Sequence, residues 1–261
     1  MIGLATDDAG EGTPVVLLHG LTGTRRYVVM GSRSLERSGH RVVAYDARGH
    51  GGSDAAEPYD YAALAGDLRD LLDRLGIDRA VLAGASMGAH TAARFALEHP
   101  GRVLGLVAIT PAYEPGRDKD LERWDALSDG LRTGGVDGFV AAYGAPDVPE
   151  PWRETVITVI RQRLGAHEHP EAVAAALREV PRSDPFGELS YLRAVAAPSV
   201  VVASRDEADP GHPLEVGEAW ARELGARLVV EEPGESPIAW QGGRLSKVIA
   251  ALAAEAVAAT P

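Results

Sequence analysis

The chain has 261 residues, 45% of them hydrophobic and 25% charged, so its length and composition suit one large globular α/β domain. Its formal net charge is -12, with acidic and basic residues mixed along the chain, which argues against nucleic acid or an anionic membrane as a partner. It contains no cysteine, which excludes disulfides, thiolate catalysis and cysteine-ligated metals.

Apolar runs of strand length alternate with helical patterns in the first half of the chain. Leucines recur at helical spacing from residue 59 to 76, and a second helix of small residues ends near residue 99. Four apolar runs predict buried strands: Pro14–Gly20, His40–Asp46, Arg79–Ser86 and Val103–Pro111. This alternation predicts a mostly parallel sheet with helices on both faces.

The segment from Tyr113 to about Leu192 contains no convincing strand. We interpret residues 113–192 as a helical cap inserted over the C-terminal edge of the sheet, within a single domain of residues 1–261. The helix-like pieces are separated by glycine and proline: Leu121–Leu131, Val136–Tyr143, Trp152–Leu164 and Glu171–Val180.

The strand and helix alternation resumes after the cap. Ala197–Ser204 and Ala226–Pro233 predict two more strands, with a helix from about Pro213 to Leu224 between them. A last helix begins near Arg244. The start of the chain lacks a basic region and a long apolar run, and no stretch approaches the ~20 apolar residues of a membrane span. We therefore expect a cytoplasmic protein that does not enter a membrane.

The pentapeptide GASMG, Gly84–Gly88, carries the strongest chemical signal. It matches G-x-S-x-G, follows a predicted strand and opens a predicted helix. The glycines let strand and helix approach closely, so that Ser86 sits on a sharp turn with its hydroxyl held out from the sheet edge. Ser86 is therefore the candidate nucleophile.

Three motifs together resemble the α/β-hydrolase superfamily: LLHGLTGT (Leu17–Thr24), DARGHGGSD (Asp46–Asp54) and GASMG. The resemblance covers nearly the whole chain and implies a mostly parallel, eight-stranded sheet, flanked by helices, with a helical cap. It also implies an oxyanion hole made by the backbone N–H groups of Met87, after the nucleophile, and Leu21, after the His-Gly pair. Backbone donors fixed by the fold stabilise a tetrahedral oxyanion without reorganising.

The family places an acidic residue in the loop after the strand that ends near Ser204. That loop offers Asp206 and Asp209. We favour Asp209, because Pro213 stands four residues on, where the family commonly begins a helix. In a catalytic triad such a carboxylate fixes the tautomer of the histidine and stabilises its protonated form.

The family's catalytic histidine is missing from its usual place. Gly234 is followed by Glu235, and no histidine occurs after His212. Glu235 can act as the base only if burial raises its pKa from about 4.3 toward neutrality. His212, which lies close to Asp209 in the chain, is a second candidate. Otherwise the site performs chemistry that needs only an oxyanion hole and a cavity, such as a lyase reaction or a cofactor-free isomerisation, or it binds a ligand without catalysis.

Five other histidines have structural interpretations. We expect His19 to order the His-Gly loop, His50 to sit in a turn, and His90 to pack within its helix. HEHPE, residues 167–171, is interpreted as a solvated loop in the cap, because no partner ligands for a metal lie near it in the sequence.

The sequence thus predicts a hydrolase-type enzyme acting on a small, fairly apolar ester, lactone or related carbonyl compound. Transfer of the acyl group to an acceptor other than water stays open, because it shares the acyl-enzyme with hydrolysis. No G-x-G-x-x-G motif follows a strand, so no nicotinamide cofactor is expected, and no metal is expected either. A non-catalytic small-molecule-binding protein on the same scaffold is the alternative.

Overall fold

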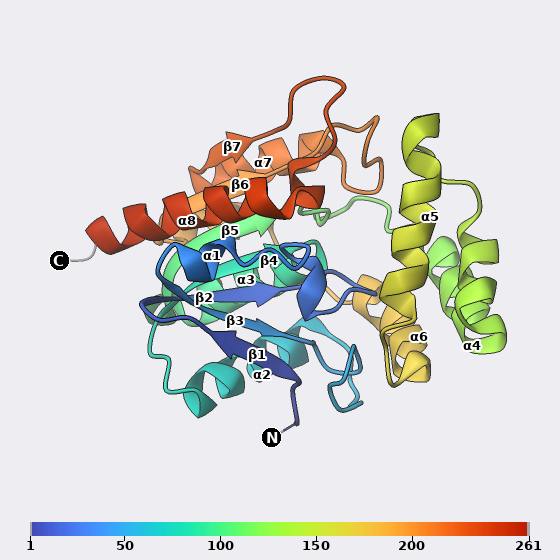
Figure 1. The fold of residues 1–261 in the computed structure, drawn as a ribbon, viewed down its shortest axis with the longest axis horizontal. Helices are drawn as coiled ribbons and strands as arrows, with labels where there is room; N and C mark the ends of the chain where they lie inside the picture. The colour runs from blue at the N-terminus through green and yellow to red at the C-terminus, as the bar shows by residue number, and fades with distance from the viewer. Residues whose placement is uncertain (1, 260–261) are drawn as a thin grey trace.

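The computed structural model describes residues 2–259, and seven of its strands form one sheet (Figure 1). Across the sheet the order is β1-β3-β2-β4-β5-β6-β7, and every neighbouring pair is parallel except β1 with β3. The predicted mostly parallel sheet is therefore confirmed. The strands are β1 (Thr6–Ala9), β2 (Thr13–Leu18), β3 (His40–Tyr45), β4 (Ala80–Ala85), β5 (Val103–Ile109), β6 (Ser199–Val202) and β7 (Arg227–Val229).

The number of strands differs from the eight that the resemblance implied. Six of the seven match predicted strands, and β1 is the one that the sequence analysis missed. Its sequence, TDDA, is polar, and Asp8 pairs with Arg41 of β3 at 2.6 Å. A strand at the edge of a sheet needs no apolar face, so it leaves no hydrophobic pattern. After β7 the described chain forms a loop, the 3-10 helix Ile238–Trp240 and a final helix, with no eighth strand.

Helices cover both faces of the sheet because alternate strand residues point to opposite sides. Val16 and Leu18 of β2 belong to the core that packs against α2 and α3, whereas Val15 and Leu17 belong to the core that packs against α1 and α8. α7 joins the first face beside β6. These helices are α1 (Ser34–Arg37), α2 (Tyr61–Arg74), α3 (Met87–Glu98), α7 (Leu214–Leu224) and α8 (Gly242–Ala258).

The segment between β5 and β6 is helical and contains no strand; the structure describes all of its residues. Figure 1 shows α4, α5 and α6 lying together beside the sheet. α4 turns back at Gly135, whose φ is 60°, and a Cβ added to Gly130 would lie 2.5 Å from the carbonyl oxygen of Gly138. The elements are α4 (Leu121–Tyr143), α5 (Glu150–Leu164), α6 (Pro170–Glu179) and the 3-10 helices Val180–Arg182 and Leu189–Ala194.

This helical insertion lies over the loops that follow two central strands. Leu21, after β2, and Met87, after β4, pack against Ala172 and Ala176 of α6. Leu21 also packs against the insertion's own apolar core, which includes Phe139. Because both loops follow the carboxyl ends of parallel strands, the insertion covers that edge of the sheet. Within residues 2–259 no helix is long and apolar enough to cross a membrane.

Candidate active site

Ser86 occupies the single position between β4 and α3, with φ 50° and ψ -112°. This left-handed backbone geometry is costly for a residue with a side chain, and such strain clusters at functional sites. The flanking glycines permit it. A Cβ on Gly84 would lie 2.2 Å from the carbonyl oxygen of Gly88, and a Cβ on Gly88 would lie 2.2 Å from that of Leu18. The strand–turn–helix geometry predicted for GASMG is therefore present.

The His-Gly loop lies beside this turn. A Cβ added to Gly20 would lie 3.4 Å from the Ser86 Cβ, and the N–H of Gly23 donates to the Gly20 carbonyl at 2.8 Å to close a tight turn. Within residues 2–259 the N–H groups of Leu21 and Met87 have no protein acceptor. That of Met87 belongs to the first turn of α3, where backbone donors lack helical partners. Two unpaired donors thus flank the Ser86 turn.

Asp209 and His212 form a pair in the loop after β6. Asp209 Oδ1 and His212 Nδ1 are 2.9 Å apart, and the two side chains are 17% and 27% exposed. The other candidate, Asp206, accepts the Leu214 N–H at 2.7 Å and so caps the start of α7. The structure thus gives the two aspartates different tasks, and Asp209 is the one that contacts a histidine.

The Asp209 contact sets the chemistry of the imidazole. Burial by itself lowers the pKa of His212, but the charge of Asp209 and the hydrogen bond to it outweigh burial and raise that pKa above its usual value. An ionised carboxylate only accepts hydrogen bonds, so Nδ1–H donates to Asp209 and the lone pair is on Nε2. Among the described residues Nε2 has no partner. This is the tautomer that a general base requires.

His90 connects this pair to the helix that begins at the nucleophile turn. Its ring accepts the N–H groups of Ala112 and Tyr113 at Nε2, both at 3.1 Å, and its Nδ1 contacts the Tyr61 hydroxyl at 2.8 Å. Burial, with a smaller contribution from the charge of His212, lowers the pKa of His90 to about 3. His90 is therefore a neutral, packed helix residue.

Glu235 does not meet the condition set for a base. Its side chain is 48% exposed and pairs with Arg244 at 2.7 Å. The hydrogen bond from Arg244 lowers the pKa of Glu235 below its usual value, which is the opposite of the rise that a base at this position would need. The reason is the loop geometry: Gly234 has a φ of 81°, and the loop turns at the surface.

A buried carboxylate that the sequence analysis missed holds this loop instead. Glu231 is 1% exposed and accepts the N–H of Arg205 at 2.7 Å and that of Ile238 at 3.4 Å. It therefore ties the loop after β7 to the start of the loop that carries Asp209. The sequence gives no local signal that separates Glu231 from its exposed neighbour Glu232.

His19 orders the His-Gly loop, as its structural interpretation expects. Its Nε2 accepts the Ala47 N–H at 2.9 Å and its Nδ1–H donates to the Gly20 carbonyl at 2.8 Å. Burial lowers the pKa of His19 to about 4. The ring of His50 packs against it with the two centroids 5.2 Å apart.

His167 departs from its interpretation as part of a solvated loop. Its Nδ1 accepts the Gly51 N–H at 2.8 Å and its Nε2–H donates to the Thr22 carbonyl at 3.0 Å. The adjacent Glu168 N–H donates to the Gly51 carbonyl at 2.9 Å. His167 thus fastens the insertion to both loops below it. Residues 2–259 contain no group of three or more His, Asp or Glu side chains arranged to hold a metal ion.

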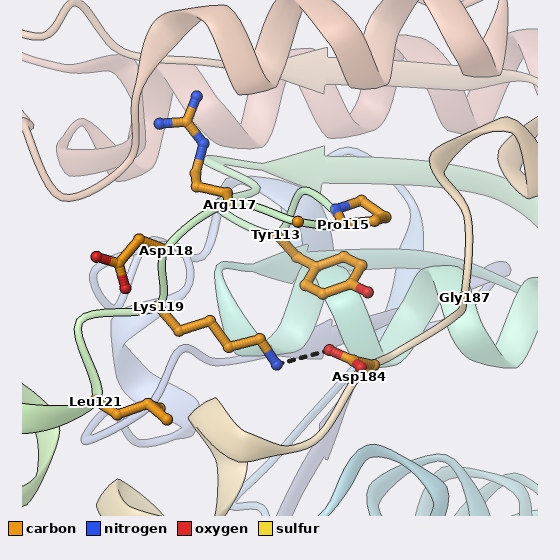
Figure 2. A pocket seen from close by; sticks show the side chains of 9 residues that line it. Tyr113, Pro115, Arg117, Asp118, Lys119, Leu121, Asp184 and Gly187 are labelled. Carbon is orange, nitrogen blue, oxygen red and sulfur yellow. Dashed lines mark hydrogen bonds and ion pairs between the residues drawn. The ribbon is translucent and has the colours of Figure 1, made fainter.

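An open cavity of about 430 Å³ lies where the insertion leaves the sheet (Figure 2). Lys119 crosses it to pair with Asp184 at 2.6 Å, and the Tyr113 hydroxyl donates to the Phe186 carbonyl at 2.8 Å. Its lining is Tyr113, Pro115, Gly116, Arg117, Asp118, Lys119, Leu121, Asp184 and Gly187, and so includes none of the proposed catalytic side chains.

Similarity to known proteins agrees with this fold. The chain is 34% identical over 218 residues to a 2-hydroxy-6-oxononadienedioate/2-hydroxy-6-oxononatrienedioate hydrolase of Pseudomonas putida, covering 77% of this chain and 74% of that protein. It is 34% identical over 138 residues to the mouse sn-1-specific diacylglycerol lipase ABHD11, covering 52% of this chain and only 40% of the lipase. A malate-bound thermophilic esterase from Thermogutta terrifontis superposes with a TM-score of 0.82 at 30% identity, covering 98% and 94% of the two chains. Residues 13–166 match the family model of the alpha/beta hydrolase fold, and the chain belongs to that family.

Proposed function

We propose that the protein is a serine hydrolase in which Ser86 is the nucleophile, His212 the general base and Asp209 the carboxylate that orients it. The backbone N–H groups of Leu21 and Met87 form the oxyanion hole. The observation that carries this proposal is the 2.9 Å contact between His212 Nδ1 and Asp209 Oδ1, because it pairs an imidazole with the carboxylate of the acid loop, whereas the family's usual histidine position holds Glu235.

The proposed reaction follows the triad scheme. The Ser86 hydroxyl attacks the acyl carbon while its proton passes to His212 Nε2, and the carbonyl electrons move onto the oxygen that faces Leu21 and Met87. The protonated imidazole, stabilised by Asp209, gives its proton to the departing alkoxide as the carbon–oxygen bond breaks. Water then attacks the acyl-enzyme with His212 again acting as base, which releases the acid and restores the serine.

We further propose a small ester or lactone as substrate. Named relatives of this chain are an esterase, a lipase and a hydrolase of an oxo-dioate, and ester cleavage is the chemistry that the first two share. Leu21 and Met87 pack under α6, so a substrate at the oxyanion donors lies beneath the helical insertion. That arrangement favours a compact acyl group over a long chain.

Steady-state hydrolysis of p-nitrophenyl acetate tests the proposal. Ser86→Ala and His212→Gln are expected to lower kcat by on the order of 10⁴- to 10⁶-fold, because triad members act as a unit. Glu235→Gln is the matched control: it removes a carboxylate that is exposed and paired with Arg244, and it should keep wild-type activity. If the Ser86→Ala protein still hydrolyses the ester, Ser86 is not the nucleophile. If activity is lost in Glu235→Gln and kept in His212→Gln, His212 is not the base.

A further inference from the structure

Glu231, in the loop after β7, is a buried carboxylate whose hydrogen-bond partners are backbone groups. Its side chain is 1% exposed, and its two oxygens accept the N–H groups of Arg205 and Ile238. A carboxylate out of contact with water is costly to bury unless such donors surround it. Removing the carboxylate would in turn leave a buried backbone donor without an acceptor. The contacts of Glu231 therefore hold two chain segments in fixed positions.

Two hydrogen bonds in opposite directions join Glu231 to Arg205, which begins the acid loop of residues 205–213. The Arg205 N–H donates to Glu231 Oε1 at 2.7 Å, and the Arg205 Nε–H donates to the Glu231 carbonyl at 3.0 Å. The loops after β6 and β7 leave the same edge of the sheet, because these strands are parallel neighbours (Figure 1). Among residues 2–259, Glu231 is the one side chain outside the acid loop that hydrogen-bonds to it. Glu231 therefore anchors the start of the acid loop.

Backbone hydrogen bonds lead from this anchor to the proposed base. The Arg205 carbonyl accepts the Asp209 N–H at 3.1 Å, and the Asp209 carbonyl accepts the His212 N–H at 3.0 Å. The side chains of Asp209 and His212 then meet at 2.9 Å. Each of these bonds begins at the residue where the previous one ends, so a displacement of Arg205 moves both members of the pair.

We propose that Glu231 is a positioning residue: its carboxylate holds the acid loop so that Asp209 and His212 keep the contact that orients the imidazole. The family's histidine belongs to the loop after β7, where this chain has the exposed Glu235. In this chain that loop supplies Glu231 instead, and the acid loop carries both members of the pair. The inference rests on the proposed function for the catalytic role of His212, and its spectroscopic test does not need turnover.

Steady-state kinetics with p-nitrophenyl acetate measure the effect of the anchor. Glu231→Ala should lower kcat by about 10- to 100-fold, because a displacement of a catalytic group by about 1 Å can cost about 100-fold. KM should change little, since Ser86 and the oxyanion donors belong to other loops. Glu231→Gln keeps an acceptor for the Arg205 N–H and should restore most of kcat. Glu232→Ala is the matched control: it removes the neighbouring, exposed carboxylate and should keep wild-type kcat.

The pH profile of kcat/KM distinguishes positioning from a general loss of structure. Asp209 raises the pKa of His212. A loosened pair should therefore lower that pKa and move the acidic limb of the profile to lower pH in Glu231→Ala. A general loss of structure lowers the rate at every pH and leaves the limb in place. An unmoved limb in the folded Glu231→Ala protein overturns the inference.

Proton NMR of the His212 Nδ1–H separates this inference from the proposed function. A proton held between an imidazole and a carboxylate resonates downfield of the backbone amides, and its loss in His212→Gln assigns the signal. The wild type and Glu232→Ala should show the signal, and Glu231→Ala should lose it. If Glu231→Ala loses the signal while ester hydrolysis is absent or unchanged, the positioning of the pair stands and the serine hydrolase proposal fails.

A signal that persists in Glu231→Ala, or that is absent from the wild type, overturns the inference. If Glu231→Ala does not fold, Arg205→Leu takes its place, because it removes only the bond from the half-buried Arg205 side chain to the Glu231 carbonyl. That variant should broaden the signal and lower kcat by a smaller factor. An unchanged signal in Arg205→Leu then counts against the anchor in the same way.

Discussion

Acidification should destabilise the protein through His90, the buried neutral histidine one turn after the nucleophile. His90 is 6% exposed, and burial lowers its pKa to about 3 in the folded state. In the unfolded chain the pKa returns to about 6.5. Between these two values the unfolded state binds one proton more than the folded state, so stability falls as the pH falls.

The size of the effect follows from the two pKa values. About pH 5 lies roughly 1.5 units below the pKa of the imidazole in the unfolded chain, whereas the ring in the folded protein is still neutral at that pH. Each of these units corresponds to about 1.4 kcal/mol of unfolding free energy. His90 alone should therefore remove about 2 kcal/mol of unfolding free energy between about pH 7 and pH 5. Other buried histidines, such as His19, also lower the unfolding free energy on acidification, and they do so in every variant.

Urea unfolding followed by tryptophan fluorescence at the two pH values measures this loss. His90→Gln starts from a lower stability, because its ring no longer bridges Tyr61 and Tyr113, but it should lose about 2 kcal/mol less on acidification than the wild type. His99→Gln, the same substitution at the C-cap of the same helix, should lose as much as the wild type. Equal losses in wild type and His90→Gln would refute a neutral His90.

Three further outcomes are expected. Arg163→Gln should shift the acidic limb of the pH profile of kcat/KM for p-nitrophenyl butyrate to higher pH, because removing the positive charge raises the pKa of His212; a shift to lower pH contradicts this. His167→Ala should lower the unfolding free energy in urea by about 1–3 kcal/mol and speed amide hydrogen exchange in residues 46–54, because two hydrogen bonds between the insertion and the loops are lost. His169→Ala, at an exposed side chain, should have neither effect. Gly88→Ala should give little folded protein by near-UV circular dichroism, since its Cβ would lie 2.2 Å from a backbone oxygen, and a stable, active variant would contradict the geometry.

The elements that the sequence predicts well are those set by local chemistry. The buried strands are marked by apolar runs of a few residues. The Ser86 turn is marked by the glycines on either side of it, which let strand and helix approach closely. The polar strand β1 is recognisable only through its partner β3, because TDDA contains no apolar residue larger than alanine.

The identity of the base depends on the tertiary structure and could not be read from spacing. Glu235 and His212 were both open candidates, and they differ in the exposure of the side chain and in its partner. Glu235 is the more exposed and pairs with Arg244, whereas His212 contacts Asp209. The surroundings of Arg163 depend on the tertiary structure as well. On a helix with charged neighbours an arginine predicts a solvated face, yet the Nε of Arg163 is buried and makes no hydrogen bond.

Labelling with a fluorophosphonate tests most directly whether Ser86, His212 and Asp209 act together. The probe reacts with a serine only where a base removes its proton, so the rate of labelling reports the proposed proton transfer. Intact mass and peptide mapping should show one adduct, on Ser86, in the wild type and at the same rate in Glu235→Gln. His212→Gln should label at least about 10³-fold more slowly. A wild type that does not label, or a His212→Gln protein that labels as fast as the wild type, would contradict the assignment of the base.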